Sequence, residues 1–384
     1  MENLVLSEFK LGIIAGGQLG KMLSLAASTW NIKTYILDPD EDCPAVGCCN
    51  HFIKGDFLDF DTVYRFGKMV DMVTFELENV NIEALKQLKA EGLKICPDPE
   101  ILELIKDKGR QKEFYRHHSI PTAPFKLFND KGEIMEAIND GNVSFPFVQK
   151  LRTGGYDGKG VEVIKSFEDL ANLMNGPAVI EDKVNIQKEL SIIVARNEKG
   201  DIQCFPAVEM EFNETENLVE RLICPANIDD SSSMQCMNMA KKIIQELNMV
   251  GLLAVEMFVT DKNEIIINEI APRPHNSGHH TIESVITSQF EQLLRAIFNL
   301  PLGSTNLKIP AVMINLLGSP GYQGKVKYEG LTECMAIEGV KIHLYGKKIT
   351  KPYRKMGHVT IISQSIKDAI IKSEIVKQKL KVIA

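Results

Sequence analysis

Short apolar runs alternate with glycine-bearing turns and helix-like spacing through the first hundred residues. Residues 11–15 (LGIIA) form an apolar run, GGQLG follows it, and the next apolar side chains recur at the spacing of one helix face. Two further β-branched and aromatic runs, 34–37 and 69–75, end at Asp38 and Glu76. Strands that alternate with helices form parallel sheets, and the functional edge of such a sheet lies at the carboxyl ends of its strands. We therefore predict an α/β, Rossmann-like domain here.

The first glycine turn allows two interpretations. Its sequence, AGGQLG from Ala15, resembles the dinucleotide-binding fingerprint, and Asp38 follows at about the distance expected for a ribose contact. The alternative is a tight strand-to-helix turn of the kind found in any doubly wound domain. In both cases the N–H groups at the start of the helix suit a phosphate, so we expect an anionic ligand there.

A second glycine cluster, TGGYDGKG at 153–160, lies between two predicted strands and follows Lys150 closely. Four glycines in eight residues exceed what an ordinary hairpin needs, so the cluster predicts a lid whose N–H groups close over phosphates. Tyr156 and Asp157 at its tip are placed to reach a substrate. The alternative is a flexible hairpin that binds nothing.

The spacing of a predicted hairpin places two glutamates opposite each other. The apolar runs 252–259 and 265–270 flank a polar turn, and a turn centred on Lys262 and Asn263 places Glu256 directly opposite Glu269. Opposed residues share a face with Cβ atoms about 5 Å apart, where two like charges repel each other. Mg²⁺, which prefers oxygen ligands and bridges nucleotide phosphates, would relieve this repulsion. A shift of one residue would instead send the glutamates to opposite faces.

Polar residues near two prolines continue this segment. Arg273, His275 and Asn276 lie in backbone that Pro272 and Pro274 keep from being helical, so they can hold a small anion beside the glutamates.

Two further polar patterns each leave an alternative open. His275 and His279 also have the spacing of a zinc site, although the prolines oppose the regular helix that such a site requires. Near the C-terminus, Arg354 and Lys355 form either a solvated basic turn or a contact for a phosphorylated substrate.

Composition restricts the remaining possibilities. The chain has 384 residues, enough for two or three domains, and its net charge of −7 argues against a nucleic-acid partner. Eight cysteines without CxxC spacing predict reduced thiols, and no apolar run approaches the roughly 18 residues of a membrane helix. The first ten residues lack the pattern of a secretion signal. We therefore expect a soluble cytoplasmic enzyme that uses ATP, Mg²⁺ and a second, anionic substrate, without a membrane partner.

The order of motifs along nearly the whole chain resembles one family. GGQLGKM, FELENV, RTGGYDGKG, VIEDKV, VEMF, INEIAPRPHNSGH and RKMGH resemble the ATP-grasp enzymes that are N5-carboxyaminoimidazole ribonucleotide synthetases of purine biosynthesis. The resemblance implies a Rossmann-like substrate domain (1–100), an ATP-grasp domain (101–300) with a lid subdomain at about 120–185, and a small β-rich domain (301–384). It also implies a homodimer. In this reaction, ATP phosphorylates bicarbonate to carboxyphosphate, and the amine of aminoimidazole ribonucleotide captures the activated carboxyl.

The resemblance also assigns roles to matching residues. Arg273, His275, Asn276 and Asp157 would be catalytic, with the first three binding bicarbonate or carboxyphosphate. Metal binding would fall to Glu256 and Glu269, ATP binding to Lys108, Lys150, Glu181, Val184, Glu189 and Asn268, and ribonucleotide binding to Gln18, Glu76, Tyr156, Arg354 and Lys355. The chain departs from the family pattern at Ala15, where glycine is common, at Lys108, which is often arginine, and at FELEN, where FEFEN is commoner. Either Glu76 or Glu78 would face the substrate.

Three alternatives remain. A formate-dependent ligase of glycinamide ribonucleotide would share the architecture and the metal pair, but its signature strings differ from those above. An NAD-dependent dehydrogenase would explain the first glycine turn and Asp38, but neither Glu256 with Glu269 nor the second glycine cluster. A non-catalytic nucleotide sensor would have no need of Arg273 and His275.

Overall fold

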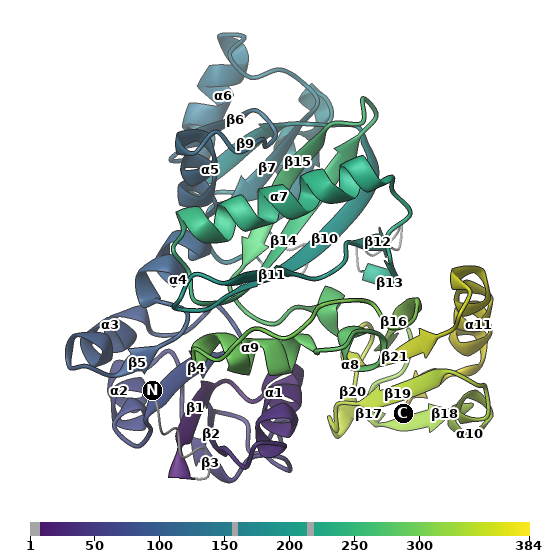
Figure 1. Ribbon diagram of the computed structural model, residues 1–384. Coiled ribbons are helices and arrows are strands. Elements are labelled where there is room, and N and C mark those ends of the chain that lie inside the picture. Colours follow the sequence, from purple (N-terminus) through teal and green to yellow (C-terminus); the bar gives the residue numbers. More distant parts are fainter. Residues whose placement is uncertain (1–7, 156–159, 213–218) are drawn as a thin grey trace.

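The N-terminal part of the molecule is a five-stranded parallel sheet. The structure is a computed structural model that describes residues 8–155, 160–212 and 219–384. The strands lie in the order β3-β2-β1-β4-β5, with connecting helices around them (Figure 1). The three strands predicted from apolar runs are confirmed, whereas β3 and β5 are short and mostly only part-buried, so they carry little apolar signal. The elements are β1 (Lys10–Ile14), α1 (Gln18–Ser28), β2 (Lys33–Asp38), β3 (His51–Lys54), α2 (Phe60–Gly67), β4 (Met72–Phe75), α3 (Ile82–Ala90) and β5 (Lys94–Ile95).

Two helices follow, α4 (Pro99–Lys106) and α5 (Lys108–His117), and Asp107 separates them. The extended backbone of Asp107 ends α4, while its side chain accepts hydrogen bonds from the N–H groups of Gly109 and Arg110 at the start of α5. Arg152 donates to both carboxylate oxygens of Asp107, at 2.8 and 2.6 Å. The break therefore anchors the base of the second glycine cluster beside Lys108.

A four-stranded antiparallel sheet in the order β6-β9-β7-β8 comes next. The strands β7 and β8 pair on either side of the second glycine cluster, which confirms the two strands predicted there. Tyr156 and Asp157 lie outside the described residues. The elements are β6 (Phe125–Phe128), α6 (Lys131–Asn139), β7 (Phe147–Leu151), β8 (Val161–Ile164), η2 (Phe167–Asn172) and β9 (Ala178–Asp182).

The largest sheet carries the centre of the molecule and continues into the C-terminal part. Its main path is β15-β14-β10-β12-β13-β16-β21-β19, with β11 paired to β10. Helix α7 packs on one face of β10 and β14, and α9 packs on the other, between this sheet and α1 (Figure 1). The elements are β10 (Ile186–Arg196), β11 (Ile202–Cys204), β12 (Val208–Phe212), β13 (Val219–Cys224), α7 (Asp230–Glu246), β14 (Gly251–Thr260), β15 (Ile265–Ala271), η3 (Asn276–Gly278), α8 (Thr281–Ser284), α9 (Gln289–Ile297), β16 (Ala311–Leu317), β19 (Val340–Leu344) and β21 (Lys355–Ile362).

The C-terminal part is rich in strands, as predicted, but its main strands extend the central sheet, because β16 pairs with β13. The Lys-rich helix α11 is followed by β22, which pairs with β18. Among the described residues, no helix is both long and apolar enough to cross a membrane. The remaining elements are β17 (Gly324–Lys325), β18 (Lys327–Glu329), α10 (Leu331–Met335), β20 (Ile349–Thr350), α11 (Ile366–Lys379) and β22 (Lys381–Ile383).

Candidate active site

A row of polar side chains crosses three strands of the central sheet. Ser191 on β10 lies opposite Glu256 on β14, and Glu256 lies opposite Glu269 on β15. Further along β10, Ile193 and Ala195 point to the same side as Ser191 and pack under α9. The row therefore continues the α9 face of the sheet beyond its apolar core. The predicted opposition of the two glutamates is confirmed.

The hairpin has this register because of a β-bulge that the sequence does not predict. Near the turn, Val259 pairs with Ile265, one residue out of step with a turn centred on Lys262 and Asn263. A β-bulge at Asn268 restores the register before Glu269. Asn268 is the additional residue of the bulge, between Ile267, which lies opposite Met257, and Glu269, which lies opposite Glu256. Its amide oxygen accepts a hydrogen bond from Lys150 at 2.8 Å.

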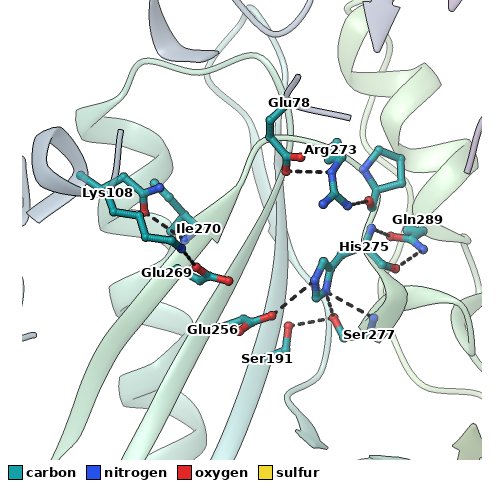
Figure 2. A network of polar contacts seen from close by, with 12 residues as sticks. Glu78, Lys108, Ser191, Glu256, Glu269, Ile270, Arg273, His275, Ser277 and Gln289 are labelled. Atoms are coloured by element: carbon teal, nitrogen blue, oxygen red, sulfur yellow. Dashed lines mark hydrogen bonds and ion pairs between the residues drawn. The ribbon is translucent and has the colours of Figure 1, made fainter. Parts of the chain in front are cut away.

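Three lysines meet the acidic groups at this edge. Lys108, the first residue of α5, bonds to Glu269 (Figure 2). Lys112, one turn further along α5, and Lys150 on β7 lie 3.0 and 3.1 Å from the two carboxylate oxygens of Glu181 on β9. The enclosed space among these residues, Gln111 and Asn268 is only about 10 Å³, room for one water at most. Phosphate oxygens that reach these lysines must therefore replace the oxygens now bound to them.

Charge pairing shifts the ionisation of the cluster. Burial and the nearby charge of Glu269 both raise the pKa of Glu256. Desolvation alone would raise the pKa of Glu269 as well, but the charge and hydrogen bond of Lys108 outweigh it and lower that pKa. Burial lowers the pKa of Lys112 to about 8 despite the attraction of Glu181. The two opposed glutamates are thus unequal, because only one of them has a lysine bonded to it.

The segment after β15 places the predicted anion-binding residues beside this row. Arg273 donates from Nε to Glu78 at 2.8 Å, which ties it to the N-terminal domain. Gln289 holds the backbone of His275 on both sides, accepting from its N–H at 2.9 Å and donating to its carbonyl at 2.8 Å. The imidazole Nε2 lies 3.4 Å from Glu256 (Figure 2). Asn276 follows at the start of η3.

Lys347 connects two residues that were predicted to bind the ribonucleotide. Lys347 donates to the side-chain oxygen of Gln18 at 3.4 Å and to the carbonyl of Lys355 at 2.8 Å. Gln18 begins α1 and Lys355 begins β21, so this bridge joins the first and last parts of the chain. The side chain of Arg354 instead donates to the carbonyl of Ile349, within its own turn.

The first glycine turn binds the protein's own carboxylates, which corrects the expectation of an anionic ligand at these amides. The N–H of Gly16 donates to Asp38 at 2.7 Å, and those of Gly17 and Gly20 donate to the two oxygens of Glu76. A Cβ atom on Gly17 would lie 2.2 Å from the Glu76 carboxylate, so this close approach requires glycine. Asp38 is therefore occupied by the turn itself, which favours the simple strand-to-helix interpretation. Substrate contact by Glu76 stays a prediction.

The other predicted ATP contacts lie nearby, and the structure adds residues that the sequence did not reveal. Glu189 points to the same side of β10 as Ser191, and burial raises its pKa to about 7. Val184 lies between β9 and β10. Lys112 could have been found, because it is four residues after Lys108 and so shares its helix face. Ser277 lies within the motif INEIAPRPHNSGH but received no role from the sequence, and neither did Gln289.

The opposed glutamates supply oxygen donors of the kind that Mg²⁺ prefers. Glu256 and Glu269 offer carboxylate oxygens from one face of the sheet, and Mg²⁺ commonly takes one or two carboxylates and completes its shell with waters and phosphates. Across the described ranges, no group of three or more His, Cys, Asp or Glu side chains could hold a metal ion. The residues therefore fit Mg²⁺ bound together with a phosphate rather than by protein alone.

The fold and the site together define the class of the protein. Family models match a ribonucleotide synthetase preATP-grasp domain at residues 9–106, an ATP-grasp domain at 113–290 and a phosphoribosylaminoimidazole carboxylase C-terminal domain at 311–372. The chain is therefore an ATP-grasp protein.

Individual relatives specify the family within that class. A protein from Bacillus subtilis named N5-carboxyaminoimidazole ribonucleotide synthase is 37% identical over 358 residues, covering 92% of this chain and 91% of that protein. The crystal structure of the synthetase from Thermotoga maritima is 45% identical, with a TM-score of 0.90 over 98% of this chain and 99% of that chain. A structure from Aspergillus clavatus, in complex with ADP and 5-aminoimidazole ribonucleotide, is 29% identical, with a TM-score of 0.89 over 97% and 99%. The chain belongs to the N5-carboxyaminoimidazole ribonucleotide synthase family.

Proposed function

We propose that this enzyme uses ATP to carboxylate the amine of 5-aminoimidazole ribonucleotide with bicarbonate. ATP transfers its γ-phosphoryl group to a bicarbonate oxygen, giving ADP and carboxyphosphate. The amine nitrogen then attacks the carboxyl carbon, phosphate leaves and the nitrogen loses a proton. The observation that carries the proposal is the row of Ser191, Glu256 and Glu269, with lysines at one end and Arg273 and His275 at the other.

The lysine end of the row is suited to the triphosphate. Lys108, Lys112 and Lys150 are held by carboxylates and an amide oxygen that phosphate oxygens can replace. Glu256 and Glu269 would hold Mg²⁺, which when bound neutralises phosphate charge and bridges phosphate oxygens. Release of Lys108 from Glu269 would then free one cation for phosphate and one carboxylate for the metal. In this scheme Glu181, Val184, Glu189 and Asn268 complete the ATP site.

The other end of the row is suited to bicarbonate. Arg273 presents a guanidinium oriented by Glu78, and His275 presents an imidazole whose backbone Gln289 holds in place. Fixed donors of this kind stabilise a small planar anion without reorganisation during the reaction. Asn276 adds an amide beside them, so the anion would lie between these groups and the γ-phosphate.

The ribonucleotide would bind where the first and last parts of the chain meet. Gln18 and Lys355, joined through Lys347, supply polar and cationic groups there. Arg354 and Glu76, with Tyr156 and Asp157 of the glycine cluster, complete the assignment. The domain limits 1–100, 101–300 and 301–384, the homodimer and the cytoplasmic location belong to the same proposal.

Coupled detection of ADP tests the proposal. Bicarbonate is stripped from the buffer and then restored, and aminoimidazole ribonucleotide is compared with glycinamide ribonucleotide plus formate. We expect full ADP release only with bicarbonate and aminoimidazole ribonucleotide together. Equal rates with formate and glycinamide ribonucleotide would refute the substrate assignment and leave the ATP site standing.

A further inference from the structure

We propose that Ser277, supported by Ser191, is a positioning residue that keeps the proton of neutral His275 on Nε2 and points that N–H at the anion site beside Glu256. The inference rests on the proposed function, because the anion is bicarbonate or the carboxyphosphate formed from it. The three side chains and Glu256 form one connected network (Figure 2).

A backbone group shows the direction of this network, and the Ser277 hydroxyl makes the shorter of the two contacts with the ring. The N–H of Ser277 can only donate, and it points at Nδ1 of His275 from 3.3 Å. A ring nitrogen that accepts a hydrogen bond carries no proton, so the proton of the neutral ring is on Nε2. The hydroxyl of Ser277, 2.8 Å from the same Nδ1, must then donate to it as well. Its oxygen in turn accepts from Ser191 at 2.8 Å.

The network begins and ends on the same row of the sheet. Ser191 lies opposite Glu256 on the neighbouring strand, and the chain of hydroxyls returns through His275 to a point 3.4 Å from Glu256. Ser191 and Ser277 are each only 1% exposed, so water does not compete for their hydroxyls. The ring is therefore held from its Nδ1 side by groups that cannot exchange their partners for solvent.

Close packing fixes the backbone that carries Ser277. Gln289, which is fully buried, clamps the His275 backbone, and Gly278 lies against it. A Cβ atom on Gly278 would lie 2.5 Å from the Gln289 side-chain oxygen and 2.3 Å from Ile193, so the segment fits only with glycine. The ring orientation thus follows from the packing of η3 against the sheet.

The orientation has a chemical consequence for an anion. With its proton on Nε2, His275 offers a hydrogen-bond donor on the side that faces the carboxylates. With the proton on Nδ1, the Nε2 lone pair would face that side and repel an anionic oxygen. Removing the Ser277 hydroxyl should therefore weaken binding of bicarbonate and slow its phosphorylation while leaving ATP affinity unchanged.

The test compares Ser277→Ala with a matched control, Ser284→Ala. Ser284 is also buried and its hydroxyl also contacts Nδ1 of a histidine, His280 at 2.7 Å, but it lies outside the network. The ¹⁵N spectrum of histidine-labelled protein, with the His275 signals assigned through His275→Gln, reports which ring nitrogen carries the proton. Steady-state ADP release gives kcat and separate KM values for bicarbonate and ATP.

We expect wild-type His275 to be a single Nε2–H tautomer and Ser277→Ala to show a mixture, because the backbone N–H that remains lies 3.3 Å from Nδ1 and holds it less firmly than the hydroxyl at 2.8 Å. We expect kcat/KM for bicarbonate to fall about tenfold, the effect of one ordinary hydrogen bond, with KM for ATP unchanged. Ser284→Ala should change neither. If Ser277→Ala does not fold, Ser277→Cys, which keeps a weak donor of similar size, should show the same changes to a smaller extent.

Three results would overturn the proposal: an Nδ1–H tautomer in the wild type, an unchanged tautomer in both Ser277 variants, or equal losses for bicarbonate and ATP. The tautomer measurement needs no substrate. A wild-type enzyme without bicarbonate-dependent activity would therefore refute the proposed function separately from the ring orientation.

Discussion

Neutralising one glutamate of the opposed pair should stabilise the free enzyme, and neutralising the other should destabilise it. Simple repulsion between Glu256 and Glu269 would predict the same gain for both substitutions. The structure makes them unequal, because Lys108 bonds to Glu269, whereas burial and the charge of Glu269 raise the pKa of Glu256. We therefore expect Glu256→Gln to raise the melting temperature without nucleotide and Glu269→Gln to lower it.

The magnitudes follow from the geometry. Like charges about 5 Å apart repel by about 3 kcal/mol at an effective dielectric constant of about 20, so Glu256→Gln can gain at most that amount. Protonation of Glu256 already removes part of the repulsion near neutral pH, which makes a gain of about 1–2 kcal/mol realistic. Glu269→Gln leaves Lys108 without the carboxylate to which it bonds. Breaking a fully buried pair costs about 3–5 kcal/mol, and since the Glu269 side chain is 41% exposed we expect about 1–3 kcal/mol.

The pH dependence gives the sign of the Glu256 effect. The pKa of this group in the folded protein lies above its ordinary value of 4.5, so the folded state holds its proton more tightly than the unfolded state does. The penalty is absent below that ordinary value and grows as pH rises through the raised one. The melting-temperature gain of Glu256→Gln should therefore be larger at pH 8 than at pH 5.

The assay combines thermal melts of the wild type and the variants at both pH values with ATP turnover at saturating Mg²⁺. Both variants should lose turnover, because each removes a carboxylate proposed to hold the metal. Glu209→Gln is the control, since Glu209 pairs with Lys188 at 2.8 Å away from the row, and it should lose stability but keep turnover. Melting shifts of the same sign in Glu256→Gln and Glu269→Gln, or a gain for Glu256→Gln that does not vary with pH, would refute the reasoning.

Four other outcomes are expected. Glu78→Gln, which removes the charged partner of Arg273, should raise KM for bicarbonate about tenfold in ADP-release kinetics and leave KM for ATP unchanged. Glu76→Gln should lower the free energy of unfolding by about 1–3 kcal/mol in denaturant melts, because an amide NH₂ must face a backbone N–H that the carboxylate now accepts from. Ala15→Gly should be neutral or stabilising in the same melts, whereas glycine in place of alanine usually costs about 0.5–1 kcal/mol within a regular element, because Ala15 has a φ of 72° that favours glycine. Lys355→Ala should weaken aminoimidazole ribonucleotide in titration calorimetry by about 1.5–3 kcal/mol, the range of a charge-assisted contact, and leave ATP binding unchanged.

Local sequence patterns predicted the strands of the fold better than the breaks between its helices. Apolar runs correctly located three parallel strands and the hairpin of β14 and β15, since burial on a sheet depends on periodicity within the run itself. No local pattern marked the break at Asp107 between α4 and α5. The partner that stabilises the break is Arg152, which is 45 residues away and so invisible to any local pattern.

In the site, too, local spacing predicted some contacts, and contacts between distant parts of the chain were missed. A turn centred on Lys262 and Asn263 was enough to pair Glu256 with Glu269, although the bulge at Asn268 that restores this register was not foreseen. The glycine turn misled for a different reason. Its N–H groups do bind carboxylates, but Glu76 is supplied by a strand 59 residues from Gly17 in the chain, and only the assembled sheet shows that the protein itself occupies those donors.

The contacts of Arg273 show how a single segment would serve both halves of the proposed reaction. Its guanidinium bonds to Glu78 of the N-terminal domain, while its backbone continues β15, which carries Glu269. His275, two residues later, is bound to the central sheet through Ser277 and Ser191. An anion held between Arg273 and His275 would thus lie at the junction of the nucleotide-binding sheet and the domain proposed to hold the ribonucleotide. Since carboxyphosphate is lost to water unless the amine is already near, an anion placed at this junction would be protected by proximity.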